Sequence, residues 1–181
     1  KKFELANVSH FTKKGSSIAK GVMEYINEQY DPGMGWKDAE YCIKRWGGPF
    51  AIKGVMSVDD AKRAVEVGAS AIMLSNHGGR QLDGSRAPFD QLPAIADAVG
   101  GKIEIIVDGG IRRGTHVLKA LSLGATACSF GKGYLFGLGA GGQNGVEAVL
   151  QRLQDEIRRD MILLGCKSIK DLSKTNIIFR K

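Results

Sequence analysis

Four short apolar runs, each followed by a turn rich in glycine or polar residues, most constrain the fold of this 181-residue chain. The runs are residues 50–55, 69–74, 103–107 and 125–130. They have the length of buried strands, and the stretches between them carry apolar residues at helical spacing. Because strands that alternate with helices form parallel sheets, the pattern predicts an α/β fold. A doubly wound sheet and a (β/α)₈ barrel both agree with this pattern.

Helices are also expected around these units. Residues 36–46 carry apolar side chains on one helical face, and a long apolar stripe runs through 146–164. The helix after the second unit is expected to begin near Leu92, and the glycine-rich stretch 134–142 is expected to separate the last strand from the long helix. Residues 169–181 are expected to form a short helix and a loosely held end. No G-x-G-x-x-G motif follows the first strand, which argues against a dinucleotide-binding sheet.

Composition excludes several classes of protein. No apolar run approaches the ~20 residues that span a bilayer. The three cysteines, Cys42, Cys128 and Cys166, are far apart and odd in number, which argues against a disulfide framework or a zinc site and for a reducing compartment. The formal net charge is +7, but the basic residues are spread along the chain and aromatic residues are few. We therefore expect no nucleic-acid partner and no metal.

The second apolar run leads directly into the sequence Ser-Asn-His-Gly-Gly-Arg-Gln-Leu-Asp-Gly at residues 75–84. It places a hydroxyl (Ser75), an imidazole (His77) and a guanidinium (Arg80) within six residues. An imidazole titrates near neutral pH, and a guanidinium grips an anion through two parallel hydrogen bonds. The pair suits an anionic substrate that must lose a proton. The alternative for His77 is a loop histidine bonded to the backbone.

Lys53 interrupts the first apolar run close to its end. A lysine inside a strand is costly to bury unless it faces a polar ligand. We therefore expect Lys53 to stabilise negative charge, for example on a reduced cofactor ring. The alternative is that the side chain only extends to solvent.

The third and fourth runs end in sequences typical of a phosphate site. Asp108-Gly109-Gly110-Ile111-Arg112-Arg113-Gly114 leads into a helix, whose N-terminus carries partial positive charge and exposed N–H groups. An arginine beside those groups adds a two-pronged contact. Gly131-Lys132-Gly133 offers small residues and a cation at the next strand end. Phosphate sites of this kind occur after the last two strands of (β/α)₈ barrels.

These residues resemble the FMN-dependent L-2-hydroxy acid dehydrogenases and oxidases. The resemblance rests on Trp36-Lys37-Asp38, Lys53-Gly54, residues 75–83, residues 108–114 and Gly165-Cys166. It covers nearly the whole chain, and residues 75–83 are its most specific part. Tyr30-Asp31-Pro32 and residues 134–142 look most like the bacterial respiratory L-lactate dehydrogenases and mandelate dehydrogenases.

The resemblance implies FMN as the cofactor and a role for each matched residue. Lys53 matches the lysine that contacts the flavin ring and stabilises its anionic reduced form, and Ser75 matches another flavin contact. His77 matches the catalytic base, and Arg80 matches the arginine that holds the substrate carboxylate. The flavin ribityl and phosphate segment is matched by Asp108, Gly109, Gly110, Ile111, Arg112, Gly131 and Lys132. Lys132 stands where the family has arginine, so a two-pronged contact becomes a point charge and weaker binding is expected.

In the family these motifs belong to strands 5 to 8 of the barrel, so this chain resembles a C-terminal half. A half-barrel leaves two open sheet edges and an uncovered core face, which favour association. We therefore expect a fragment, or one piece of a split enzyme, completed by an N-terminal half from the same or a separate chain. Residues 31–166 are expected to form the four βα units and 167–181 a tail. Residues 1–30 are expected to form a loop or a segment that binds a membrane or a partner.

The implied activity is FMN-dependent oxidation of an L-2-hydroxy acid, with L-lactate as the favoured substrate and pyruvate as its product. Either a hydride or a carbanion route is compatible with these residues. Electrons are expected to pass to a quinone, a cytochrome or oxygen, and the full enzyme is expected to be a cytoplasmic homo-oligomer or a peripheral protein on the inner face of the cell membrane. Two alternatives stay open: an oxidase acting on glycolate or mandelate, and a catalytically silent half-barrel that binds flavin or phosphate.

Overall fold

The computed structural model describes residues 18–179 and divides the chain into two units, residues 1–38 and 39–181. Helix α1 (Ile18–Gln29) belongs to the first unit, and α2 (Trp36–Trp46) has the bounds that the sequence predicted. The part of the expected membrane or partner segment that precedes α1 lies outside the described residues. Over the described part of the chain, no helix is both long and apolar enough to cross a membrane.

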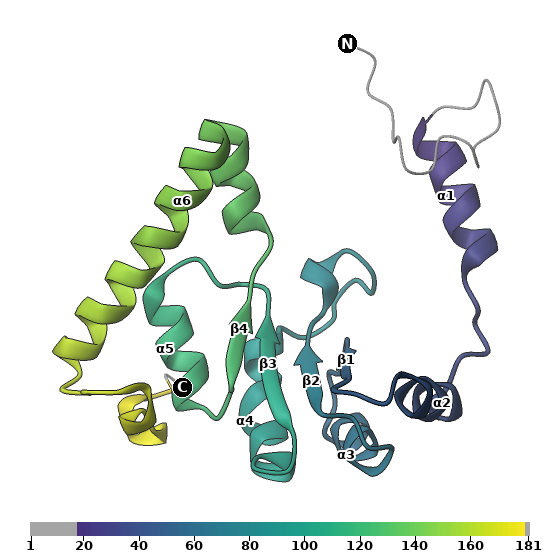
Figure 1. The fold of residues 1–181 in the computed structure, drawn as a ribbon, viewed down its shortest axis with the longest axis horizontal. Helices are drawn as coiled ribbons and strands as arrows, with labels where there is room; N and C mark the ends of the chain where they lie inside the picture. The colour runs from purple at the N-terminus through teal and green to yellow at the C-terminus, as the bar shows by residue number, and fades with distance from the viewer. Residues whose placement is uncertain (1–17, 180–181) are drawn as a thin grey trace. The chain divides into compact units, whose positions relative to one another are not determined.

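The second unit contains a four-stranded parallel sheet with the strands in chain order (Figure 1). The strands are β1 (Ala51–Lys53), β2 (Ala71–Leu74), β3 (Glu104–Asp108) and β4 (Ala127–Ser129). The helices that follow them are α3 (Val58–Glu66), α4 (Pro88–Val99), α5 (Gly114–Ser122) and α6 (Lys132–Leu163). The predicted alternation of strands and helices is therefore confirmed.

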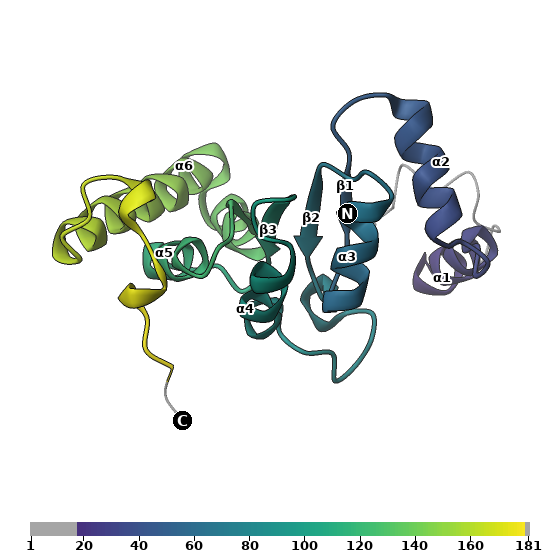
Figure 2. The same ribbon diagram turned by 90° about the horizontal axis from the view of Figure 1, so that it is seen from below.

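The two faces of the sheet have different surroundings. One face packs against helices: α4 contacts β2 and β3, and α5 contacts β4 (Figure 2). The side chains at the centre of this core are Ile72, Leu74, Leu92, Ile95, Ile105 and Val107. On the other face, Lys53, Met73 and Ile106 lie side by side in register and stay exposed or half-buried. This second face carries the polar residues of the strand ends.

Two helices begin earlier than the sequence predicted. Helix α4 begins at Pro88 instead of Leu92, because proline at a first helical position has a suitable φ and needs no hydrogen-bond partner for nitrogen. Helix α6 includes the glycine-rich stretch, which was expected to be a separate segment. It bends at Gly141–Gly142 and doubles back (Figure 1). A Cβ added at Gly137 would lie 2.6 Å from the carbonyl oxygen of Gly145, so glycine permits this close crossing.

The C-terminal tail is held more firmly than expected. Two short 3₁₀ turns, η2 (Ile169–Asp171) and η3 (Lys174–Asn176), follow α6, and η3 contacts α5. Lys174 also forms an ion pair with Asp97 on α4. The tail is therefore anchored to two of the helices that cover the sheet.

A buried carboxylate joins α6 to the start of α5. Glu156, only 5% exposed, accepts a hydrogen bond from the backbone N–H of Gly114 at 2.8 Å. Its other oxygen accepts from Nε of Arg113 at 2.8 Å and from Nε of Arg152 at 3.2 Å. The hydrogen bonds from Arg113 and from the Gly114 backbone lower the pKa of Glu156 to about 2, against the opposing effect of burial. We call Glu156, Arg113 and Gly114 the Glu156 clamp.

The lowered pKa predicts how stability depends on pH. Ionised Glu156 stabilises the folded state fully above its ordinary pKa of 4.5, and this contribution is lost as pH falls towards about 2. The difference in unfolding free energy between the parent and Glu156→Gln should therefore shrink as pH is lowered from 4.5 to 2. Urea unfolding at a series of pH values measures it. Glu147→Gln is the control, because Glu147 is exposed on the same helix and accepts a hydrogen bond from the neighbouring Gln143. A difference independent of pH would contradict the prediction.

Candidate active site

The carboxyl ends of neighbouring parallel strands bring three predicted residues into one network. Lys53 ends β1, Ser75 directly follows β2, and Asp108 ends β3. Nζ of Lys53 lies 2.9 Å from Oγ of Ser75 and 2.6 Å from Oδ2 of Asp108. Oγ of Ser75 donates to the same carboxylate oxygen at 2.7 Å. We call these three residues the strand-end network.

The two charged groups of the strand-end network, Lys53 and Asp108, differ in their exposure to solvent. Partial burial acts to raise the pKa of Asp108, but hydrogen bonds from Lys53, Ser75 and Ser129 and the charge of Lys53 outweigh it, so this pKa lies below its ordinary value. Asp108 is therefore an anion at neutral pH. The Lys53 side chain is 50% exposed and that of Asp108 only 19%. The cation of the network is therefore accessible at the surface, and its anion is largely buried.

Directly after Ser75, the chain forms a tight 3₁₀ turn at His77–Gly79, here called the His77 turn. The N–H of His77 donates to Oγ of Ser75 at 3.2 Å, which ties the turn to the strand-end network. Asn76 accepts from the N–H of Gly78 at 3.0 Å and donates to the carbonyl of Arg86 at 3.3 Å. His77 has φ of 57°, a left-handed conformation that is strained for a residue with a side chain. Strain of this kind is typical of functional turns.

The side chains of His77 and Arg80 are exposed. Within residues 18–179 neither has a hydrogen-bond or ion-pair partner. The alternative of a histidine ring bonded to backbone therefore does not describe His77 here. Asn76 holds the turn in place, a role that was not predicted from the sequence. The preference of asparagine for the positions that begin helical turns was the available signal.

The turn after β3, residues 109–112, offers hydrogen-bond donors to an anion, and we call it the anion loop. Gly109 and Gly110 have φ of 89° and 74°, left-handed values that glycine adopts readily. The N–H of Gly109 donates to the carbonyl of Ser129 at 3.0 Å. The N–H groups of Gly110 and Ile111 have no partner among the residues described, and the Arg112 side chain is exposed. Buried Ile111 anchors the loop. The loop therefore has the donors that a phosphate requires.

The start of α6 adds a second group of donors. Gly131 caps this helix without a side-chain hydrogen bond, so its first N–H groups and partial positive charge remain available. Nζ of Lys132 lies 3.8 Å from the point that a Cβ on Gly78 would occupy, which places this cation beside the His77 turn. Gly131 and Lys132 thus belong to the same end of the sheet as the other predicted residues.

At the N-terminus of α5, which the sequence predicted to contribute donors to the phosphate site, the first N–H group and one arginine are already occupied. Glu156 already accepts the N–H of Gly114 and pairs with Arg113. The arginine that remains available is Arg112, whose backbone N–H donates to Nδ1 of His116 at 3.2 Å. Sequence reasoning assigned no role to Glu156, because the residue lies 42 positions from its partner. No local pattern signals such a contact.

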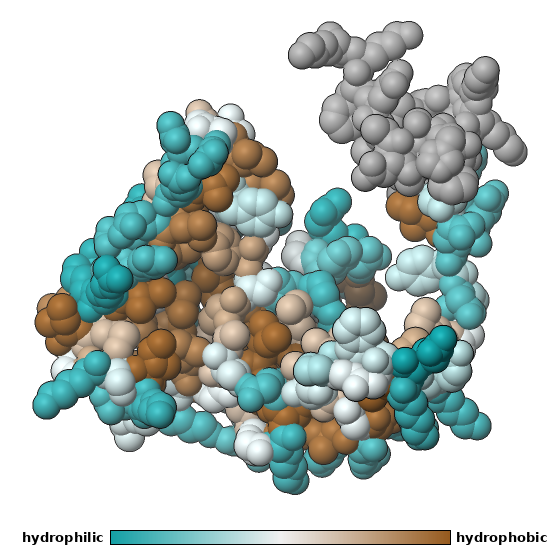
Figure 3. Space-filling view, in the orientation of Figure 1, coloured by the Kyte–Doolittle hydropathy of each residue, from teal (hydrophilic) through white to brown (hydrophobic). Residues whose placement is uncertain are grey.

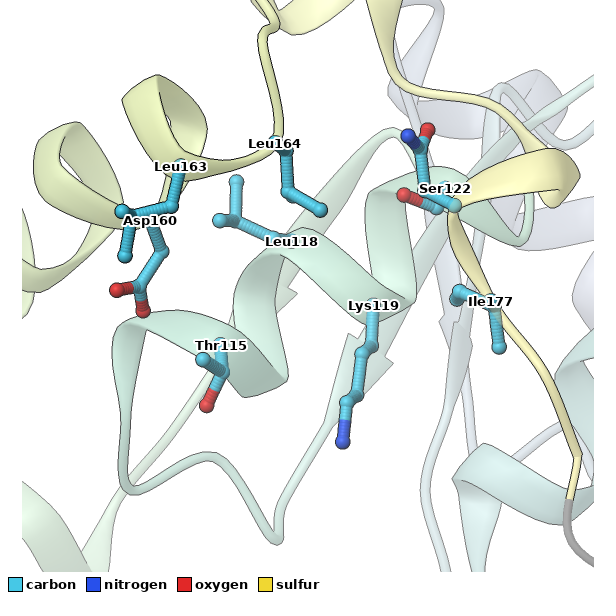
Figure 4. Close-up of a pocket in the computed structure, with 9 residues that line it drawn as sticks. Thr115, Leu118, Lys119, Ser122, Asp160, Leu163, Leu164 and Ile177 are labelled. Atoms are coloured by element: carbon cyan, nitrogen blue, oxygen red, sulfur yellow. The ribbon is translucent and has the colours of Figure 1, made fainter.

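A cavity of about 260 Å³ lies elsewhere, between α5, the end of α6 and the tail (Figure 4). Leu118, Leu163 and Leu164 form much of its wall, and none of the predicted site residues lines it. It is therefore not the predicted site. Throughout the described region, no group of three or more residues is arranged to bind a metal ion.

Comparison with known proteins agrees with this geometry. The family model described as "FMN-dependent dehydrogenase" matches residues 2–179. Pre-mycofactocin synthase of Mycobacterium tuberculosis is 52% identical over 147 residues, which are 81% of this chain and 37% of that protein. L-lactate oxidase of Nostoc sp. is 48% identical over 152 residues, 84% of this chain and 42% of that protein.

Among solved structures, the monotopic membrane protein (S)-mandelate dehydrogenase superposes with a TM-score of 0.83 at 33% identity, covering 94% of this chain and 45% of its own. The chain spans less than half the length of each of these three relatives. Its four parallel βα units correspond to half of the (β/α)₈ barrel that the sequence predicted. The matched span, the fold and the relatives together show that the chain belongs to the FMN-dependent dehydrogenase family.

Proposed function

We propose that this chain is the C-terminal half of an FMN-dependent enzyme that oxidises an L-2-hydroxy acid, with L-lactate as the favoured substrate. The observation that carries the proposal is the strand-end network, tied through Ser75 to a strained His77 turn. The turn presents His77 and Arg80 with unpartnered side chains within residues 18–179. A base and a guanidinium thus lie next to a fixed cation, which suits the deprotonation and oxidation of an anionic hydroxy acid.

The chain's own donors fit FMN. The phosphate requires N–H groups and cations, and the anion loop, Arg112, Gly131 and Lys132 supply both. Half-exposed Lys53 fits an anionic flavin ring, and Ser75 fits a polar contact to it. When bound, FMN supplies an acceptor for two electrons. Lys53 stabilises the negative charge that accompanies them.

Arg80 and His77 have separate roles in substrate binding and proton transfer. Arg80 binds the substrate carboxylate through two parallel hydrogen bonds and so orients the hydroxyl-bearing carbon. Oxidation of a 2-hydroxy acid to a 2-keto acid removes two electrons and two protons. His77 would accept the hydroxyl proton while the α-hydrogen leaves with both electrons as hydride, or it would accept the α-proton while the hydroxyl proton passes to solvent. Asp108 is a poor base, because its pKa is lowered and Lys53 and Ser75 occupy its oxygen.

A complementary N-terminal half completes the barrel in this proposal. The sheet has β1 and β4 at its edges and one face of half-exposed side chains. Hydrophobic side chains also gather along α6 (Figure 3), where Tyr134, Leu135, Phe136 and Leu138 are exposed. We assign residues 31–166 to the barrel and 167–181 to a tail that braces it. Residues 1–30 are proposed to bind the membrane surface, as supported by the monotopic relative.

The proposal also includes an electron acceptor and an oligomeric state for the complete enzyme. Electrons leave through a quinone or a cytochrome, and the complete enzyme is a homo-oligomer. L-lactate is the favoured substrate in this proposal, supported by the L-lactate oxidase of Nostoc, which is 48% identical over 84% of this chain.

Anaerobic mixing of the FMN-loaded protein, together with its complementary half, tests the function. L-lactate should bleach the oxidised flavin, because Arg80 can hold its carboxylate and His77 can accept its proton, and under the proposed preference it should do so faster than glycolate or mandelate. Re-oxidation by a quinone analogue should then outpace re-oxidation by oxygen. If flavin is bound but none of the three acids bleaches it, the proposed function is wrong and the chain is a catalytically silent half-barrel.

The His77→Gln variant identifies the base within this assay. Flavin should remain bound, and its reduction should slow by about 10²–10⁴-fold, because glutamine accepts no proton. The flavin content of the purified variant is the control. Reduction at the parent rate would assign the proton transfer to another group.

Arg80→Lys should mainly weaken substrate binding. Lysine keeps the charge but loses the two-pronged contact, so KM should rise about 10- to 100-fold with a smaller change in kcat. Steady-state kinetics measures both. Arg158→Lys, on the exposed side of α6, is the matched control and should leave KM unchanged. Equal KM values for Arg80→Lys and the parent would remove Arg80 from the substrate site.

A further inference from the structure

We propose that Glu156 is a positioning residue for the phosphate end of the site, although it touches no ligand itself. By binding Arg113 and the first N–H of α5, it fixes the end of the anion loop and leaves Arg112 as the arginine for the phosphate. The inference rests on the proposed function, because the FMN phosphate is the anion concerned.

The Glu156 clamp has little freedom to move. Both carboxylate oxygens are engaged at 2.8 Å, one by Gly114 and one by Arg113, and the side chain is buried. A Cβ added at Gly114 would lie 2.6 Å from the Cβ of Glu156 and from the N of Ile157. The first residue of α5 is therefore pressed directly against α6. Gly114 also ends the segment that begins with the anion loop, so the loop is fixed at this end.

Helix α6 reaches the proposed phosphate site twice. Its first residues, with the Gly131 cap, supply N–H groups and Lys132. After the bend at Gly141–Gly142, its second segment carries Glu156 to the end of the anion loop. The tight crossing of Gly137 and Gly145 sets the distance between these two parts. One helix thus holds both groups of donors that the phosphate needs.

The clamp also separates two neighbouring arginines. The carboxylate of Glu156 neutralises Arg113 and occupies the positive end of α5. Arg112 keeps an exposed side chain, and His116 holds its backbone N–H. Without the negative charge of Glu156, Arg113 and the Gly114 N–H would compete with Arg112 and the anion loop for the same phosphate. The phosphate would then be bound less tightly and in more than one position.

The test compares FMN with riboflavin, which lacks the phosphate, in Glu156→Gln. Fluorescence titration of the full protein with its complementary half gives both dissociation constants. The Kd for FMN should rise about 10- to 100-fold, because hydrogen bonds to a charged group are lost. The Kd for riboflavin should stay unchanged. Glu147→Gln removes the same charge from an exposed position on the same helix and should change neither value.

Amide hydrogen exchange of the flavin-free protein provides a readout that is independent of binding. Residues 109–114 should exchange faster in Glu156→Gln than in the parent or in Glu147→Gln. Should Glu156→Gln fail to fold, Arg113→Lys replaces it, because Arg113 is half-exposed and lysine keeps the charge without the Nε–H donor. This variant should show the same FMN-specific weakening to a smaller degree.

Two results would overturn the proposal. Unchanged FMN affinity in the variants would show that the clamp does not position the phosphate groups. A parallel loss of FMN and riboflavin affinity, with a lowered melting temperature, would show that Glu156 only stabilises the fold. Failure of the proposed function looks different: the parent itself would bind FMN no more tightly than riboflavin, whatever the exchange data show for residues 109–114.

Discussion

The ion pair between Lys53 and Asp108 is the interaction on which the site depends. It connects the end of β1 to the end of β3, and Ser75 at the end of β2 bonds both partners. A pair this close to solvent adds little to stability. Its contribution is geometric, because it sets the positions of three strand ends and places a cation on the face of the sheet that the helices leave uncovered.

Hydrogen bonds to the backbone connect this network to the turns that follow the strands. Ser75 accepts a hydrogen bond from the N–H of His77, and Asn76 accepts one from the N–H of Gly78. The strained turn is therefore held by side chains of the residues directly before it. The anion loop is held in the same way, by His116 at its last residue, Arg112, and by the Glu156 clamp just after it. Among the described residues, the side chains of His77 and Arg80 and the N–H groups of Gly110 and Ile111 are left unpaired, while Asn76, His116 and Glu156 hold the backbone beside them. This arrangement keeps donors in place before a ligand arrives.

Local sequence signals predicted the parts of the fold that depend on near neighbours. The bounds of α2, for example, follow from residues a few positions apart. The error at α6 has a physical cause. Glycine is a poor helix former by propensity, yet here it allows two helical segments to cross at Gly137 and Gly145, and tertiary packing overrides the local preference. For the same reason, the contact of Glu156 with the start of α5 was not predicted, since no local pattern reveals a carboxylate that arrives from another helix.

The sequence by itself determined the alternation of strands and helices, the family resemblance and the identity of the residues at the strand ends. These follow from periodicity and short motifs, which are properties of contiguous residues. Only the tertiary structure decided that Lys53, Ser75 and Asp108 share one network, that His77 adopts a left-handed backbone, and that Arg113 is neutralised while Arg112 is exposed. The network and the Arg113 pair depend on contacts between residues 22 to 55 positions apart, which form only when parallel strands and helices bring distant segments together. The turn at His77 is held by bonds to the adjacent Ser75 and Asn76, and Ser75 is itself fixed by Asp108 from a neighbouring strand.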